Sequence, residues 1–191
     1  MKSLSRLFLL GVLSCVPVAA FAASPGSWTG PHIGVLLGGN SSSSNKTDND
    51  LAFTASFLAG YDFQLTQHFV LGVGGFYEWN NQKTHSYNSC PGGGCSVRYG
   101  SRIYGLDGRV GFPVGNFNQF MPYVKVGYGR SNLSGDLSGS DSSPRYGVGF
   151  EWMSATGTAS LLIQFMHQKV NGDHGVSITN NNFTIGANFF F

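Results

Sequence analysis

The last ten residues of the chain, 182–191, read Asn182-Phe183-Thr184-Ile185-Gly186-Ala187-Asn188-Phe189-Phe190-Phe191. Every second residue from Phe183 to Phe191 is apolar, and Thr184, Gly186 and Asn188 lie between them. A period of two with one apolar face predicts a β-strand, and roughly ten residues suffice for a tilted strand to cross a bilayer. In a soluble protein so apolar a terminal strand would be an aggregation-prone edge, whereas a closed barrel in lipid would pair that edge. The stretch favours a transmembrane barrel over the alternative, a soluble β-sandwich that ends in a buried strand.

The same alternation recurs along the chain between turn-forming stretches. It predicts eight strands, at residues 28–39, 51–63, 68–80, 97–112, 120–130, 144–153, 159–169 and 182–191. Short turns at 64–67, 113–119 and 154–158 alternate with long polar loops at 40–50, 81–96, 131–143 and 170–181. This is typical of bacterial membrane barrels. The prediction is therefore an all-β fold, an eight-stranded antiparallel transmembrane β-barrel with short periplasmic turns and four longer extracellular loops. The first half of 97–112 alternates less regularly, which indicates a β-bulge there.

Aromatic residues gather near the predicted strand ends, where a ring with an apolar body suits the membrane interface. The predicted periplasmic band holds Trp28, Tyr61, Phe63, Phe69, Phe112, Trp152, Phe189 and Phe191, and the outer band holds Tyr77, Trp79, Tyr128, Tyr146 and Phe183.

Residues 1–22 have the pattern of a signal peptide, which leaves residues 23–191 as the barrel domain. Lys2 and Arg6 precede an apolar run, and Ala20-Phe21-Ala22 is a small-x-small cleavage site. The apolar run is too short to span a membrane as a helix. A second interpretation makes Cys15 the lipidated N-terminus of a lipoprotein, and the intact mass of the mature protein would separate the two.

Composition excludes several classes of function. Without Lys2 and Arg6, nine basic residues balance nine acidic ones, so nothing favours nucleic-acid binding, which usually needs a basic face. The five histidines show no metal-ligand spacing, and neither a metal nor another cofactor is predicted. Cys90 and Cys95 flank Pro-Gly-Gly-Gly, and in an exported protein this short loop favours a disulfide over two free thiols.

Several short motifs resemble the family of small outer-membrane β-barrels that includes OmpA-like and opacity-type surface proteins. They are Trp28-Thr29-Gly30-Pro31-His32-Ile33-Gly34-Val35, Gly60-Tyr61-Asp62, Phe69-Val70-Leu71-Gly72, Gly108-Arg109-Val110-Gly111 and Pro122-Tyr123-Val124. The final strand resembles the C-terminal signal that such barrels present to their assembly machinery, with Thr184, Gly186, Phe189 and Phe191 at its positions. His32 departs from the pattern, because the family commonly has an aromatic residue there. The resemblance implies an eight-stranded barrel in the cell outer membrane, and it fixes architecture better than activity.

Five charged residues fall on the inward face of the predicted strands: Glu78, Asp107, Arg109, Lys125 and Glu151. The expected register places Lys125 beside Glu151 on one neighbouring strand and near Asp107 and Arg109 on the other. A salt-bridge cluster that fills a narrow interior is favoured, because unpaired buried charges are costly. The alternative is a charged lumen that conducts ions. Numerous inward glycines make room for large side chains or leave a very narrow pore.

The sequence predicts an integral outer-membrane protein with a structural or surface-interaction role, such as adhesion or antigen display, and not an enzyme. Alternatives are a narrow porin-like channel and, more remotely, a lipid A-modifying enzyme, for which His167 lacks a nearby serine. Predicted partners are the outer-membrane lipids, the barrel-assembly machinery and a host or matrix ligand bound by the loops. Arg98, Arg102 and Arg130, near the outer rim, are candidate contacts for lipopolysaccharide phosphates, the alternative being solvated charges at the loop ends.

Overall fold

The computed structural model describes residues 27–44, 47–87, 95–115, 119–135, 139–171 and 177–191, and within them the chain forms a single closed barrel of eight antiparallel strands. The strands are β1 (Gly30–Ser44), β2 (Thr47–Thr66), β3 (Phe69–Tyr87), β4 (Cys95–Gly111), β5 (Phe120–Gly135), β6 (Gly139–Met153), β7 (Ala159–Asn171) and β8 (Ser177–Phe190). The predicted number, order and direction of the strands are confirmed. No helix in the described part of the chain is long and apolar enough to cross a membrane.

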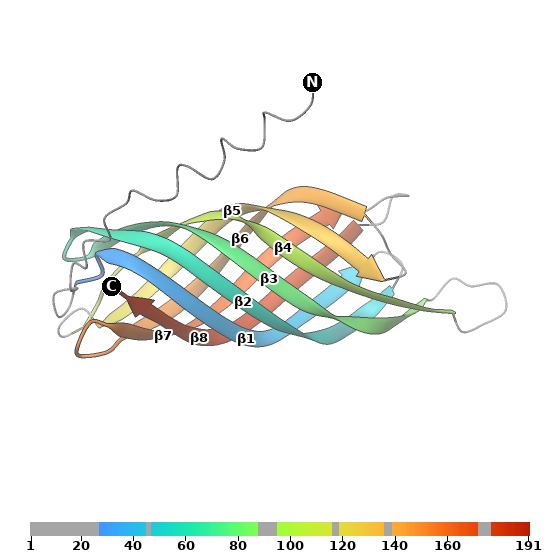
Figure 1. Ribbon diagram of the computed structural model, residues 1–191, viewed down its shortest axis with the longest axis horizontal. Coiled ribbons are helices and arrows are strands. Elements are labelled where there is room, and N and C mark those ends of the chain that lie inside the picture. Colours follow the sequence, from blue (N-terminus) through green and yellow to red (C-terminus); the bar gives the residue numbers. More distant parts are fainter. Residues whose placement is uncertain (1–26, 45–46, 88–94, 116–118, 136–138, 172–176) are drawn as a thin grey trace, which may run out of the picture.

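The barrel closes where β8 pairs with β1. Their register runs from His32 opposite Phe190 to Ser44 opposite Ile178. Because neighbouring strands alternate in direction, the two chain ends of the barrel and the connections β2–β3, β4–β5 and β6–β7 lie at one end, which we call the turn end. The opposite end, with the connections β1–β2, β3–β4, β5–β6 and β7–β8, is the loop end. Figure 1 shows the starting end of β1 and the finishing end of β8 together at the turn end.

The alternation of the sequence becomes two chemically different faces. Apolar side chains such as Ile33, Phe57, Leu106 and Ile185 are half or more exposed on the outside. Asp62, Glu151 and Asn188 are fully buried inside. An outer surface of this composition suits a lipid bilayer, because lipid solvates apolar side chains while the strands satisfy one another's backbone groups.

The strands are longer at the loop end than the sequence predicted. Most of the stretches expected to be long polar loops belong to β1–β8, and the connections between the described strand ends are residues 45–46, 88–94, 136–138 and 172–176. The barrel wall therefore continues beyond the apolar band, and the β3–β4 hairpin projects furthest (Figure 1). The prediction failed because these segments are mostly polar, and their few apolar residues, such as the buried Val170 and Ile178, do not recur with a period of two.

The bulge predicted in β4 lies on the neighbouring strand. The register of β3 and β4 shifts between Asn80 opposite Ser101 and Lys83 opposite Tyr99, so the extra residue belongs to β3. A bulge is a property of the pair, and the irregular sequence of β4 could not show which of the two strands carries the extra residue.

Candidate functional site

An apolar cluster, which we call the plug, fills the lumen at the turn end. Trp28 is fully buried and lies edge-on to Phe190, with 6.2 Å between ring centroids. Val70, Met121 and Met153 complete the plug. The prediction that Trp28 belongs to the periplasmic aromatic band is therefore wrong. An aromatic residue just before a first strand gives the same signal whether it lies at the interface or turns into the barrel.

The segment that carries Trp28 is fastened to the end of β2. The backbone N–H of Trp28 donates to Gln64 Oε1 at 2.9 Å, and the backbone N–H of Gln64 donates to Thr29 Oγ1 at 2.9 Å. These reciprocal hydrogen bonds hold residues 28 and 29 across the mouth of the barrel.

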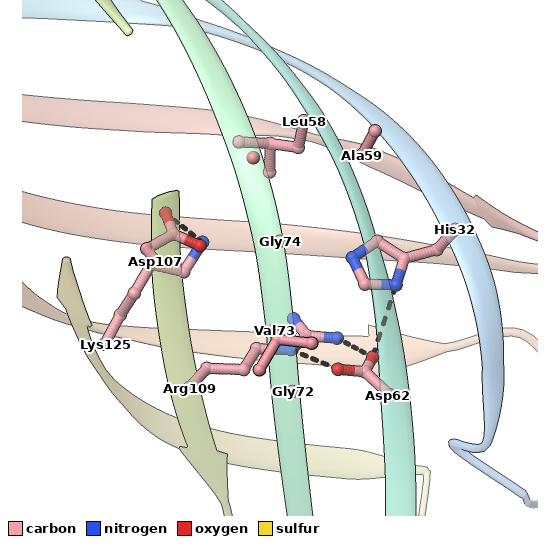
Figure 2. Close-up of a pocket in the computed structure, with 11 residues that line it drawn as sticks. His32, Leu58, Ala59, Asp62, Gly72, Val73, Gly74, Asp107, Arg109 and Lys125 are labelled. Carbon is pink, nitrogen blue, oxygen red and sulfur yellow. Dashed lines mark hydrogen bonds and ion pairs between the residues drawn. The ribbon is translucent and has the colours of Figure 1, made fainter. Parts of the chain in front are cut away.

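Above the plug, Arg109 on β4 holds two carboxylates from other strands. Its Nη1 donates to Glu151 Oε2 at 2.6 Å, and its Nε and Nη2 both donate to Asp62, the first at 2.9 Å. Asp62 also lies beside His32, whose Nδ1 is 3.5 Å from Asp62 Oδ2 (Figure 2). Because buried charges are stable only when paired and hydrogen-bonded, this arrangement fixes four strands, β1, β2, β4 and β6, relative to one another.

Glu151 accepts hydrogen bonds from three side chains. Besides Arg109, it accepts hydrogen bonds from Asn188 Nδ2 at 2.7 Å and from Ser160 Oγ. We call Asp62, Arg109, Glu151 and these partners the Arg109 cluster.

Lys125 is paired more loosely. Its Nζ is 3.7 Å from Asp107 Oδ2 and 3.5 Å from Gln164 Oε1. Lys125 does not lie beside Glu151 as predicted, because it pairs with Gly147 on β6 and the longer Arg109 side chain reaches Glu151 instead. The ring of Tyr123 lies below both cations, with Arg109 Cζ 5.5 Å and Lys125 Nζ 5.8 Å from its centroid.

Glu78 does not join the other predicted lumen charges. It lies toward the loop end, 3.4 Å from Arg145 Nη2, and accepts hydrogen bonds from Asn80 at 3.1 Å and from Asn182. Arg145 also lies over the ring of Phe76, with Cζ 3.9 Å from its centroid. The five predicted charges are thus divided among three layers.

The sequence predictions did not include three ionisable side chains of these layers, namely His32, Asp62 and Arg145. The alternation itself contained the signal. Tyr61 and Tyr146 belong to the predicted outward-facing aromatic bands, and Ile33 lies on the apolar face of the first predicted strand, so the residue next to each must face inward.

The lumen holds little free space at the level of the charges. A cavity of about 10 Å³ lies among His32, Asp62, Asp107, Arg109 and Lys125, which is room for about one water molecule. The space beside these inward-facing glycines is filled by other side chains. A Cβ on Gly149 would collide with Tyr123, and one on Gly72 would collide with Asp62 and Arg109. Among the residues that the structure describes, no three His, Cys, Asp or Glu side chains are placed to hold a metal ion.

The other predicted site residues lie outside the lumen or beyond the described residues. Arg98, Arg102 and Arg130 are exposed on the outer face of β4 and β5 toward the loop end. On the final strand, Thr184 is buried and Gly186 packs under Leu36, whereas Phe189 and Phe191 face outward. Cys90 and the side chain of Cys95 are not described, so the disulfide stays a prediction.

Comparisons with known proteins agree with this architecture. A family model described as "Outer membrane protein beta-barrel domain" matches residues 8–191. The structure is similar to Neisserial surface protein A, with 14% identity, a TM-score of 0.63 and coverage of 85% of this chain and 98% of that one.

Two further similar structures have lower scores. Ail, the attachment invasion locus protein of Yersinia pestis, has 15% identity, a TM-score of 0.46 and coverage of 84% and 99%. The N-terminal β-barrel domain of OprF from Pseudomonas aeruginosa has 16% identity, a TM-score of 0.42 and coverage of 82% and 97%. Comparison with curated protein sequences found no match. The family match and the barrel agree, and we conclude that the chain belongs to the outer-membrane protein β-barrel domain family and resides in the outer membrane.

Proposed function

We propose that this protein is a non-conducting scaffold of the outer membrane with a structural or surface-interaction role. The observation that carries the proposal is the filled lumen. An ion entering from the loop end would meet the Glu78–Arg145 pair, then Lys125 and the Arg109 cluster, and finally the plug. Eight strands enclose only enough space for such side chains.

Planar-bilayer recording of the refolded protein tests this proposal against the alternative of a narrow channel. We expect no unitary conductance steps, with insertion verified by protease protection in liposomes from the same preparation. Reproducible steps of one size would refute the scaffold and support the channel.

The surface that such a scaffold would present is the polar wall at the loop end. Strands that continue past the apolar band hold their polar side chains on a hydrogen-bonded framework, and binding sites are commonly carried by segments positioned in this way. We infer that a host or matrix ligand binds there. Shortening each of the four hairpins in turn should abolish cell or matrix binding for at least one of them. Wild-type binding by all four variants would exclude this role.

We also propose that the outer rim contacts lipopolysaccharide. In the register of β4 and β5, Arg102 pairs with Asn132 and Arg130 pairs with Tyr104, so the two arginines are diagonal neighbours on the exposed face. Arg98 lies further along the same face of β4. Arginine forks suit phosphate groups. The double variant Arg102→Glu/Arg130→Glu should lose co-purifying lipopolysaccharide, and unchanged co-purification would rule the contact out.

We propose no catalytic role. His167, the residue considered for lipid A modification, has its Nδ1 2.8 Å from Asn181 Oδ1 and its ring beside Tyr146, and neither neighbour is a serine or a carboxylate. Lipid A from cells with and without the protein should give identical mass spectra. A mass difference that disappears with His167→Ala would show enzymatic activity.

Export is proposed from the sequence. We infer that a Gram-negative bacterium cleaves the chain after Ala22 and that its assembly machinery recognises the C-terminal signal. The mature protein should then have the mass of the 169 residues that remain when 22 are removed from 191. A mass that shows a lipidated Cys15 would contradict this cleavage.

A further inference from the structure

The apolar face of the closing strand, β8, does not by itself determine the register of that strand. Every second residue from Phe183 to Phe191 is apolar, so a slip of two residues would leave an equally apolar surface toward lipid. The backbone ladders with β1 and β7 would also reform after such a slip, because every residue involved offers the same N–H and C=O groups. Residues 172–176, which connect β7 to β8, exceed the two-residue turns that fix a hairpin register. The inward side chains of β8 must therefore select its register.

Two asparagines of β8 donate hydrogen bonds to carboxylates on strands that are not its neighbours. Asn188 Nδ2 donates to Glu151 Oε1 on β6 at 2.7 Å, and Asn182 Nδ2 donates to Glu78 Oε1 on β3. All four residues are buried, with exposed fractions of 4% or less. Since β8 pairs with β1 and β7, these contacts lie outside its ladders and depend on where β8 stands along the barrel axis.

The contact between Asn188 and Glu151 distinguishes the native register from both neighbouring ones. A slip of β8 by two residues toward the turn end would bring Gly186 opposite Glu151, and a slip toward the loop end would bring Phe190 there. Neither residue has a side-chain donor. Glu151 would then lose its amide partner, and an unmade hydrogen bond to a buried carboxylate is costly.

The contact between Asn182 and Glu78 is less selective. A slip toward the turn end would bring another amide, that of Asn180, into the place of Asn182. A slip toward the loop end would bring Thr184 there, and a threonine hydroxyl can also donate a hydrogen bond. A donor of some kind would thus face Glu78 in each register, so the discrimination depends on Asn188.

Gly186 opposes the same slips by steric exclusion. A Cβ at this position would collide with the carbonyl oxygen of Val35 and with Leu36 on the neighbouring strand. After a slip of two residues, Thr184 or Asn188 would occupy this place, and either would bring such a Cβ. Specific pairing commonly combines an attractive contact with an exclusion of this kind.

We propose that Asn188 positions the closing strand, because its hydrogen bond to Glu151 selects the native register as the barrel forms. Fixing a register is the best-attested use of buried polar contacts. The role differs from a contribution to stability alone, because loss of Asn188 should move β8 along the barrel wall. Asn188 is also not one of the four residues at the positions of the predicted assembly signal.

Disulfide cross-linking of the mature protein, refolded into detergent micelles, tests the proposal. In the native register Val35 faces Ala187, and after a slip of two residues toward the turn end it would face Ile185. Val35→Cys/Ala187→Cys therefore reports the native register, and Val35→Cys/Ile185→Cys reports the slipped one, in chains whose Cys90 and Cys95 are replaced by serine. Diagonal neighbours in a ladder lie about 7–8 Å apart, too far for a disulfide, so each pair reports one register.

Both reporter pairs are placed in a Thr184→Gly background, which removes the Cβ that would otherwise block this slip. In that background alone the native cross-link should dominate, because Asn188 is still present. Adding Asn188→Ala should raise the ratio of slipped to native cross-link by at least about tenfold, the shift expected when a hydrogen bond to a charged group is lost.

Asn181→Ala in the same background is the matched control. Asn181 lies on the same strand but on its outer face, where its Oδ1 is 2.8 Å from His167 Nδ1. This variant should leave the ratio of the two cross-links unchanged.

The proposal is overturned if Asn188→Ala keeps the native cross-link, or if Asn181→Ala shifts the ratio equally. It is also overturned if Thr184→Gly alone shifts the ratio, because steric exclusion would then account for the register. Should the Asn188→Ala chain fail to refold, Glu151→Met in the same background decides, since it removes the acceptor of the same hydrogen bond. A native cross-link in that variant overturns the proposal.

Discussion

At the scale of single residues, Arg109 is the charge on which the lumen depends most. Among the residues that the structure describes, it is the only cation in direct contact with both Asp62 and Glu151, and all three are buried. Replacing it with methionine leaves two buried carboxylates without their cation partner, which typically lowers the free energy of unfolding by about 3–5 kcal/mol. Urea titration of the barrel in detergent micelles should show this loss for Arg109→Met.

Lys125→Met is the comparison for that prediction. Lys125 has a single carboxylate partner at 3.7 Å, so its removal should cost less, about 1–3 kcal/mol. Exposed Arg98→Met should change stability by no more than about 0.5 kcal/mol. Equal losses of stability for Arg109→Met and Lys125→Met would show that pairing with carboxylates does not determine how much each cation contributes to the stability of the barrel.

Glycine positions provide a second prediction at this scale. A Cβ on Gly149 would meet the Tyr123 ring and the Ile163 carbonyl oxygen, the latter at 2.8 Å, so Gly149→Ala should lower the free energy of unfolding by about 1–3 kcal/mol. Gly108 faces lipid, and its Cβ would meet nothing closer than the Gly72 carbonyl at 3.6 Å. Gly108→Ala should be neutral or mildly stabilising, because glycine weakens a strand. If Gly108→Ala lowered the melting temperature more than Gly149→Ala, the assignment of Gly149 to the lumen and of Gly108 to the lipid-facing surface would be contradicted.

At the scale of elements, the segment before β1 behaves as part of the barrel interior. Trp28→Ala removes the largest side chain of the plug and should cost about 3–5 kcal/mol. Trp152→Ala removes the same side chain from the lipid-facing surface, where Trp152 is 47% exposed, and should cost much less. Thermal unfolding followed by heat-modifiable gel mobility measures both. Similar losses would place Trp28 at the interface, as the sequence had suggested.

The extensions of the strands at the loop end make another prediction. Ser41 pairs with Leu51 on one side and with Asn181 on the other, so its amide belongs to the ladders. NMR of the protein in micelles should show strand-type Cα shifts and slow amide exchange for residues 40–43 and 178–182. Random-coil shifts with fast exchange would mean that these segments are loops after all.

At the scale of the whole molecule, the sequence was sufficient to predict the eight-stranded barrel, but not to predict which side chains contact one another inside it. Alternation is a local property, so Phe57 and Glu151 could be assigned to their faces from their neighbours alone. The reach of Arg109 across β5 to Glu151 depends on barrel curvature and side-chain length, and no local pattern contains either. The prediction missed polar strand segments such as residues 40–44 for a related reason, because a strand without an apolar face shows no alternation of apolar and polar residues.

The closure of the barrel determines everything else, because it creates both the lipid-facing surface and the enclosed charges. Val35 and Ala187 are Cα partners in the β1–β8 ladder, and directly opposite residues of antiparallel strands lie about 4.5–5.5 Å apart, within reach of a disulfide. The most direct test is oxidation of Val35→Cys/Ala187→Cys in isolated outer membranes, in a chain whose Cys90 and Cys95 are replaced by serine. We predict a cross-linked species of altered mobility on a non-reducing gel, and none for the control pair Val35→Cys/Val124→Cys. No cross-link for the first pair, or equal cross-linking of both, would contradict the closed barrel.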